Sequence, residues 1–119
     1  MITINLFGAE YEIKKSRYMN NRLALILINE DDEMISLSQN IPDALLMSEM
    51  LGEDNHTEFF VNHIDFYDYQ DVLKELEKSN IFVNGDNGLL VKGNMKSGFN
   101  TYILIEVKES IIDKMEELK

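Results

Sequence analysis

Apolar and polar residues alternate along the first part of the chain, which is the pattern of strands that bury one face. Residues 2–7 alternate in this way, and after a turn at Gly8-Ala9 residues 10–15 alternate again. Two alternating runs joined by a short turn predict an antiparallel hairpin.

The next segment, residues 22–29, is apolar in both phases of the alternation. This pattern is typical of a central strand that is covered on both faces. The four acidic residues Glu30–Glu33 follow, and they are too polar and too alike in charge to be buried. We therefore expect a solvated turn there, after which residues 34–41 return as a strand that pairs with 22–29.

Three segments carry helix signals. Pro42 and Gly52 bracket an apolar run, and proline in the first turn with glycine after the last is typical of a short helix. Asp68 is placed to cap a second helix that ends near Asn80. Residues 110–118 put their apolar side chains on one helical face, which predicts a third helix.

The rest of the pattern is that of short strands separated by polar turns. Strands are predicted over 57–62 and 99–107, a hairpin around the loop 84–88, and a polar turn over 93–98. Consecutive strands with short connections predict an α+β fold, with a mainly antiparallel sheet of six to eight short strands and two or three helices. We expect residues 1–119 to form a single globular domain.

Negative charge is concentrated in the middle of the chain. No lysine or arginine lies between Arg22 and Lys74, and the net charge of the whole chain is −11. The acidic residues of this stretch are Glu30, Asp31, Asp32, Glu33, Asp43, Glu49, Glu53, Asp54, Glu58, Asp65, Asp68 and Asp71. Charge of one sign repels nucleic acid and anionic membranes and attracts basic surfaces. The expected partner is a basic protein surface, with no direct binding to nucleic acid or membrane.

Acidic residues in predicted turns and loops are the candidates for partner contact, because loops keep them exposed. The candidate partner-binding residues are Glu30, Asp31, Asp32, Glu33, Glu53 and Asp54. Duplex DNA carries one charge per about 1.7 Å of its axis, so a row of carboxylates can occupy a basic groove that binds nucleic acid. The alternative is a solvated surface that only keeps the protein soluble.

Two other features support different functions. The apolar segment Leu45–Leu51 contains two methionines, and it would suit a small protein-interaction module or a self-associating homodimer. His56 and His63 each lie two residues from an aspartate. A metal-assisted hydrolase that uses these histidines and nearby acids is therefore the third hypothesis.

Composition and motifs remove several classes of site. The chain has no cysteine, which excludes disulfides, thiolate metal ligands and cysteine nucleophiles. Its first residues do not resemble a signal peptide, and no apolar run approaches the roughly 18 residues of a membrane helix, so we expect a cytoplasmic protein. Nucleophile-elbow, calcium-loop and phosphate-loop motifs do not fit. We assign no catalytic, metal-binding or cofactor-binding residue, and expect a protein that is not an enzyme.

Several short segments resemble a family of small domains of unknown function that bacterial phages, plasmids and conjugative elements carry. The likeness spans roughly residues 5–107. Its segments are Tyr18, Asn20-Asn21-Arg22-Leu23-Ala24, the acidic turn 30–33, Asn40-Ile41-Pro42, Phe59-Phe60-Val61, Ser97-Gly98-Phe99 and Tyr102. The resemblance implies an origin in a mobile element and a compact α+β fold, and it carries over no catalytic residue or cofactor.

Charge and resemblance together predict a non-catalytic binding protein from a mobile genetic element. Small acidic proteins of such elements often act against host defence. The sharpest form of the hypothesis is therefore an inhibitor of a host-defence nuclease, of the anti-restriction or anti-CRISPR type.

Overall fold

The N-terminal part of the chain forms an antiparallel sheet of four strands. The computed structural model describes residues 1–40 and 56–118. The strands, in the order β1-β2-β3-β4, are β1 (Ile2–Leu6), β2 (Ala9–Arg17), β3 (Leu23–Ile28) and β4 (Met34–Ser36). The predicted N-terminal hairpin is confirmed.

The turn of this hairpin lies one residue before the predicted Gly8-Ala9. It consists of Phe7 and Gly8, whose φ angles are +52° and +83°. A two-residue turn with both residues in the left-handed region matches the right-handed twist of the strands that it joins. Glycine adopts this conformation readily, whereas phenylalanine at positive φ is strained.

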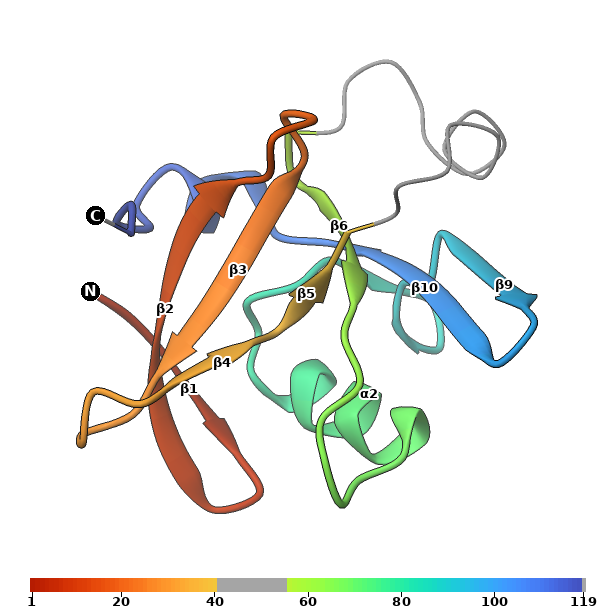
Figure 1. The fold of residues 1–119 in the computed structure, drawn as a ribbon, viewed down its shortest axis with the longest axis horizontal. Coiled ribbons are helices and arrows are strands. Elements are labelled where there is room, and N and C mark those ends of the chain that lie inside the picture. The colour runs from red at the N-terminus through yellow and green to blue at the C-terminus, as the bar shows by residue number, and fades with distance from the viewer. Residues whose placement is uncertain (41–55, 119) are drawn as a thin grey trace.

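A second antiparallel sheet has the order β5-β6-β10-β9. Its strands are β5 (Ser38–Gln39), β6 (Glu58–Val61), β9 (Gly93–Ser97) and β10 (Asn100–Glu106). The two sheets meet at Leu37, whose N–H donates to the Leu25 carbonyl (2.9 Å) and whose carbonyl accepts from the Asn62 N–H (2.8 Å). The strand predicted over 34–41 therefore changes sheets at Leu37, and β4 and β5 are its two halves (Figure 1).

Helix α2 (Tyr69–Lys78) is the longest described helix, and its predicted boundaries are confirmed. The Asp68 side chain accepts a hydrogen bond from the Asp71 N–H at 3.0 Å, as an N-cap should. Asn80 follows the helix with a φ of +61°, the left-handed conformation that stops many helices. Val72 and Leu76 face the core.

The predicted C-terminal helix over 110–118 is wrong in its extent. Helix α3 covers only Glu109–Ile112. Beyond it the chain runs beside β2, where the Lys15 N–H donates to the Glu116 carbonyl (2.9 Å) and the Leu118 N–H to the Lys15 carbonyl (2.8 Å). β1 pairs with β2 only as far as Ile13, so this part of β2 needs another backbone partner, and the C-terminal segment supplies it.

The predicted hairpin around residues 84–88 is present, but its loop is shorter than predicted, because β7 (Asn84–Gly85) and β8 (Gly88–Leu89) pair within it. One prediction nearby is wrong. The segment predicted as a polar turn, 93–98, is mostly strand β9, at the edge of its sheet. A polar, exposed edge strand and a polar turn have the same composition, so polarity alone cannot separate them.

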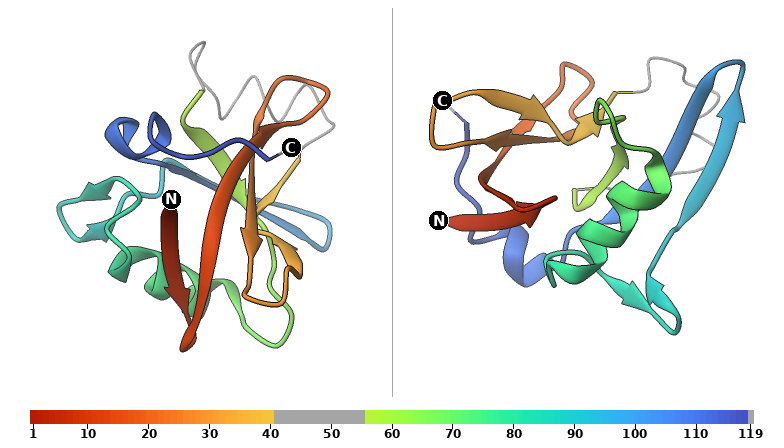
Figure 2. Two further views of the ribbon diagram at one scale, coloured as in Figure 1. Left: turned by 90° about the vertical axis from the view of Figure 1, so that its left-hand side faces the viewer. Right: turned by 90° about the horizontal axis from the view of Figure 1, so that it is seen from below.

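The hydrophobic core lies between the two sheets and is closed by α2 and α3 (Figure 2). Its fully buried members include Ile13, Leu25, Leu27, Leu37, Val61, Val72, Leu76, Ile105 and Val107. β3 was expected to be covered on both faces. Leu25 and Leu27 face the core, whereas Ile26 and Ile28 on the opposite face are only partly buried.

The described residues contain ten strand segments in three sheets and two short helices, α2 and α3. The mainly antiparallel character is confirmed, and the predicted number of strands is too low. The helix predicted between Pro42 and Gly52 lies outside the described residues. Neither α2 nor α3 is long and apolar enough to cross a membrane.

Candidate functional site

Three connections lie at one end of the molecule, at the bottom and lower left of Figure 1: the β1–β2 turn, the β3–β4 turn and the loop after β6. The rings of Phe7 and Tyr67 stack, with centroids 3.6 Å apart and planes 4° from parallel. The Phe7 N–H donates to Glu75 Oε1 of α2 at 2.6 Å. The hairpin tip is therefore fixed against both the loop and the helix.

The acidic side chains of the β3–β4 turn are exposed and do not hold the turn together, because the side chain of Asn29 does so. Asn29 Oδ1 accepts hydrogen bonds from the N–H groups of Asp31 and Glu33, both at 2.9 Å. A side-chain oxygen that replaces water at these donors fixes the turn. Asp32 takes the left-handed conformation, with a φ of +60°. The side chains of Glu30, Asp31, Asp32 and Glu33 are exposed and form no ion pair with any described residue.

A groove of about 490 Å³ begins at this turn and crosses the outer face of the first sheet. We call it the acidic groove. It is lined by Met1, Thr3, Ala9, Glu10, Tyr11, Glu12, Ile28, Asn29, Glu30, Asp31 and Asp32. Five of these side chains are carboxylates and none is basic. The side chains of the groove therefore carry charge of one sign in a concave surface, which focuses the electrostatic field.

A second groove of about 640 Å³ shares Ile28 and Asp32 with the first and extends toward the C-terminus. Its lining adds Lys14, Met34, Glu116, Glu117 and Leu118. Lys14 Nζ lies 3.8 Å from Glu116 Oε2 in an ion pair whose lysine is partly buried and whose glutamate is exposed. Met34 is 61% exposed. We call the two grooves together the acidic face, because carboxylates surround an apolar strip in it.

A small apolar pocket of about 90 Å³ adjoins the acidic groove. We call it the mouth pocket, because it lies between the hairpin tip and the loop after β6. It is lined by Leu6, Phe7, Ala9, Tyr11, Leu27, Ile35, Ile64 and Tyr67. Ala9 and Tyr11 line the groove as well. Phe66 lies two residues after Ile64 in the loop; its side chain is fully exposed and its φ is +74°.

The predicted site residues separate into two groups. The structure brings Glu30, Asp31 and Asp32 together in the acidic groove, and it leaves Glu33 exposed in the same turn. Glu53, Asp54 and the apolar segment Leu45–Leu51 lie outside the described residues.

Sequence reasoning missed Glu10, Glu12, Glu116 and Glu117. The alternation in β2 was a usable signal for the first two, because Glu10 and Glu12 lie on the same face of a strand. No local signal places residues 116 and 117 beside β2.

One acid of the middle stretch is not available to a partner. Glu58 is only 6% exposed, and its Oε1 accepts from Lys92 Nζ at 2.7 Å. Lys92 Nζ also lies 3.7 Å from Glu106, the residue opposite Glu58 in the sheet. We call Glu58, Lys92 and Glu106 the charge cluster. The hydrogen bond to Glu58 raises the pKa of Lys92 above its usual value.

Arg22 is a buried base beside this cluster. It is 5% exposed and its guanidinium lies 5.7 Å from the centre of the Phe60 ring. Desolvation lowers the pKa of Arg22, and the nearby carboxylate of Glu58 opposes this shift. Arginine stays charged under all ordinary conditions. Arg22 and Lys92 therefore balance the two carboxylates of the charge cluster.

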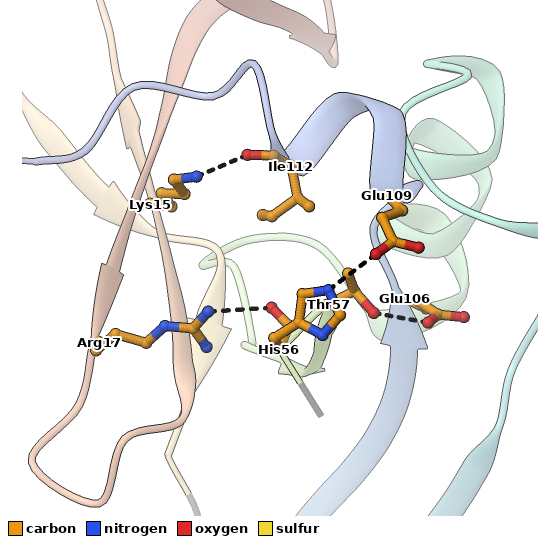
Figure 3. Close-up of polar contacts among 7 residues, drawn as sticks. All are labelled: Lys15, Arg17, His56, Thr57, Glu106, Glu109 and Ile112. Atoms are coloured by element: carbon orange, nitrogen blue, oxygen red, sulfur yellow. Dashed lines mark hydrogen bonds and ion pairs between the residues drawn. The ribbon is translucent and has the colours of Figure 1, made fainter. Parts of the chain in front are cut away.

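The two histidines lie at opposite ends of β6 and have separate surroundings. His56 Nε2 lies 3.3 Å from Glu109 Oε1, and the Arg17 guanidinium donates to the His56 carbonyl at 3.3 Å (Figure 3). His63 lies 3.9 Å from Asp65 and edge-on to the ring of Tyr69. Over residues 1–40 and 56–118, no group of three or more histidine, aspartate or glutamate side chains has a geometry that could hold a metal ion.

Comparison of the chain with protein-family models, curated proteins and solved structures finds no match.

Proposed function

We propose that the protein is a non-catalytic binding protein whose acidic face engages a basic surface of a protein partner. The observation that carries the proposal is the acidic groove, a concave surface with five carboxylates and no basic side chain. Complementary charge accelerates encounter and selects partners. The same charge repels nucleic acid and anionic membranes, so a folded protein with a basic patch is the fitting partner.

The apolar strip in the acidic face supports protein binding rather than simple solubility. Met34 is largely exposed and Ile28 partly exposed between the carboxylates of the two grooves. A surface that only keeps a protein soluble has no need of exposed apolar side chains at its centre. Protein interfaces combine an apolar centre, often with methionine, and a polar rim.

The sharpest form of the proposal is an inhibitor of a nucleic-acid-binding host-defence protein, in a protein from a mobile element. Such a target carries a basic groove for phosphates, and the carboxylates of Glu30–Asp32 and of Glu10 and Glu12 would occupy it in their place. This role requires no reaction and no cofactor from the protein itself.

The test uses two variants with the same change in charge. The groove variant is Glu10→Gln with Glu12→Gln, and the control is Asp86→Asn with Asp113→Asn, which changes two exposed acids outside both grooves. Wild type and variants are immobilised and exposed to a bacterial lysate at low salt. Each captured protein is then purified, and its affinity is measured at several salt concentrations.

We expect a basic protein that wild type and control bind equally and that the groove variant binds at least about tenfold more weakly with a shallower salt dependence. Equal binding by all three proteins would overturn the proposal, because the groove would then contribute nothing to recognition.

A further inference from the structure

The mouth pocket has the size of one side chain. We propose that it receives a single apolar side chain from the partner, next to the basic residues that the acidic groove attracts. This inference rests on the proposed function and names the chemistry of its ligand: a basic segment with one aliphatic or aromatic anchor.

The volume of the mouth pocket indicates that it receives a side chain of a larger partner and not a free small molecule. Pockets for small molecules usually measure about 300–1,000 Å³, whereas the mouth pocket measures about 90 Å³. Six of its eight lining residues have purely apolar side chains, and the other two are Tyr11 and Tyr67. The pocket therefore suits an apolar group of a few carbon atoms that arrives as part of a larger partner.

The pocket is formed before any partner binds. Leu6 and Leu27 at its base belong to the buried core. The stacked rings of Phe7 and Tyr67 form one wall, and the bond from the Tyr67 N–H to the Ile64 carbonyl (3.1 Å) holds the loop. A preformed pocket avoids the entropic cost of ordering on binding.

Backbone strain is concentrated around the same pocket. Phe7 in its wall and Phe66 beside it both have positive φ, at +52° and +74°. This conformation is unfavourable for a bulky residue. Strained residues of this kind cluster at ligand clamps and active sites. Phe66 is also fully exposed, so it adds apolar surface that a partner can cover.

The charge around the pocket selects the occupant. Ala9 and Tyr11 line both the pocket and the acidic groove, with the groove on the outer face of the first sheet and the pocket on its core face. A segment that leaves the groove around the start of β2, at Ala9, reaches the pocket. The five carboxylates of the groove favour lysine or arginine on that segment. Interfaces commonly obtain most of their affinity from a few buried anchors, while charged neighbours set the rate of encounter.

The experiment compares two synthetic peptides, acetyl-Lys-Lys-Leu-Lys-Lys-amide and the same peptide with alanine in place of leucine. Both are titrated into the protein at low salt, and binding is followed by NMR on the methyl groups of Leu27, Ile35 and Ile64 and on the amides of residues 10–12 and 30–33. The pocket-filling variant is Ala9→Leu, at an exposed position in the pocket wall. Its control is Asn94→Leu on the edge strand β9, outside the pocket.

We expect the leucine peptide to bind at least about tenfold more tightly than the alanine peptide and to shift the methyl signals of Ile35 and Ile64. Ala9→Leu should abolish the difference between the peptides, and Asn94→Leu should keep it.

If the two peptides bound with equal affinity and shifted only the signals of the acidic residues, the inference of an apolar anchor in the pocket would be overturned. The proposed function would remain intact. No binding of either peptide at low salt would overturn both. A dimer of the protein alone that Ala9→Leu dissociates would identify a second copy as the occupant, which also overturns the inference.

Discussion

The acidic groove on the first sheet and the charge cluster on the second differ in how their carboxylates are placed: those of the groove have no basic partner, and those of the cluster are paired with a lysine. In the charge cluster Glu58 is buried, and Lys92 lies between it and Glu106. In the acidic groove Glu10, Glu12 and three residues of the β3–β4 turn have no basic side chain among them. A buried charge must be paired to be tolerated, whereas an exposed one is stabilised by water. The difference shows which carboxylates fold the protein and which remain free for a partner.

The largest effect is expected from breaking the charge cluster. Lys92→Met leaves the carboxylate of Glu58 buried without its hydrogen-bond donor. We expect a loss of about 2 kcal/mol in the free energy of unfolding, below the usual range for a buried pair because the Lys92 side chain is 33% exposed. Urea unfolding measures it. Lys96→Met, on an exposed residue of β9, is the control and should cost less than about 0.5 kcal/mol.

The same pair predicts a dependence on alkaline pH. The folded state raises the pKa of Lys92 above its usual 10.5. The contribution of the pair is therefore fully present below pH 10.5 and is lost as pH rises through the raised pKa. Thermal unfolding from pH 9 to 12 should show a steeper fall for wild type than for Lys92→Met. Parallel curves would mean that Lys92 gains nothing from Glu58.

Asp68 belongs to the acidic stretch between Arg22 and Lys74, but it has a structural role that the exposed acids of the β3–β4 turn lack. Its side chain caps α2, so Asp68→Ala should lower the free energy of unfolding by about 1 kcal/mol. Gln70→Ala, on an exposed residue of the first turn of α2, is the control and should be close to neutral. If the two variants were equally stable, the cap would contribute nothing.

The hydrogen bond from the Phe7 N–H to Glu75, which fixes the tip of the β1–β2 hairpin, can be tested at acid pH. The hydrogen bond from the Phe7 N–H, and then the one from Lys78, lower the pKa of Glu75 below 4.5. Its contribution is present above that value and is lost as pH falls through the lowered pKa. Wild type should therefore lose stability more steeply than Glu75→Gln below pH 4.5. Lys74→Gln on the exposed face of α2 should keep the wild-type slope.

Local patterns sufficed for the parts of the fold that depend on neighbouring residues. The N-terminal hairpin follows from alternation and a short turn, and α2 follows from its cap at Asp68 and its stop at Asn80. Both signals act within a few residues, so the sequence displays them directly.

Long-range pairing decided the rest. Residues 116–118 leave the helical conformation because β2 offers open backbone groups beyond Ile13, about a hundred residues away in the chain. The chain over residues 34–39 changes sheets because the backbone of Leu37 bonds to both. The candidate site has the same character. The four acids of the β3–β4 turn were predictable, whereas their meeting with Glu10, Glu12 and the mouth pocket depends on the register of β2 against β3.

The smallest effect on stability, and the clearest separation of the two regions, is expected from the turn itself. Replacing Glu30 and Glu33 by Ser and Asp31 and Asp32 by Asn removes four exposed carboxylates and changes the net charge from −11 to −7. Asn tolerates the left-handed conformation of Asp32, and Asn29 still fixes the turn. The free energy of unfolding should therefore change by less than about 0.5 kcal/mol. Added salt should stabilise wild type more than the variant, because it screens repulsion that the variant lacks. A loss above about 1 kcal/mol would show that these carboxylates hold the fold, and a groove built from structural acids would not be free to bind a partner.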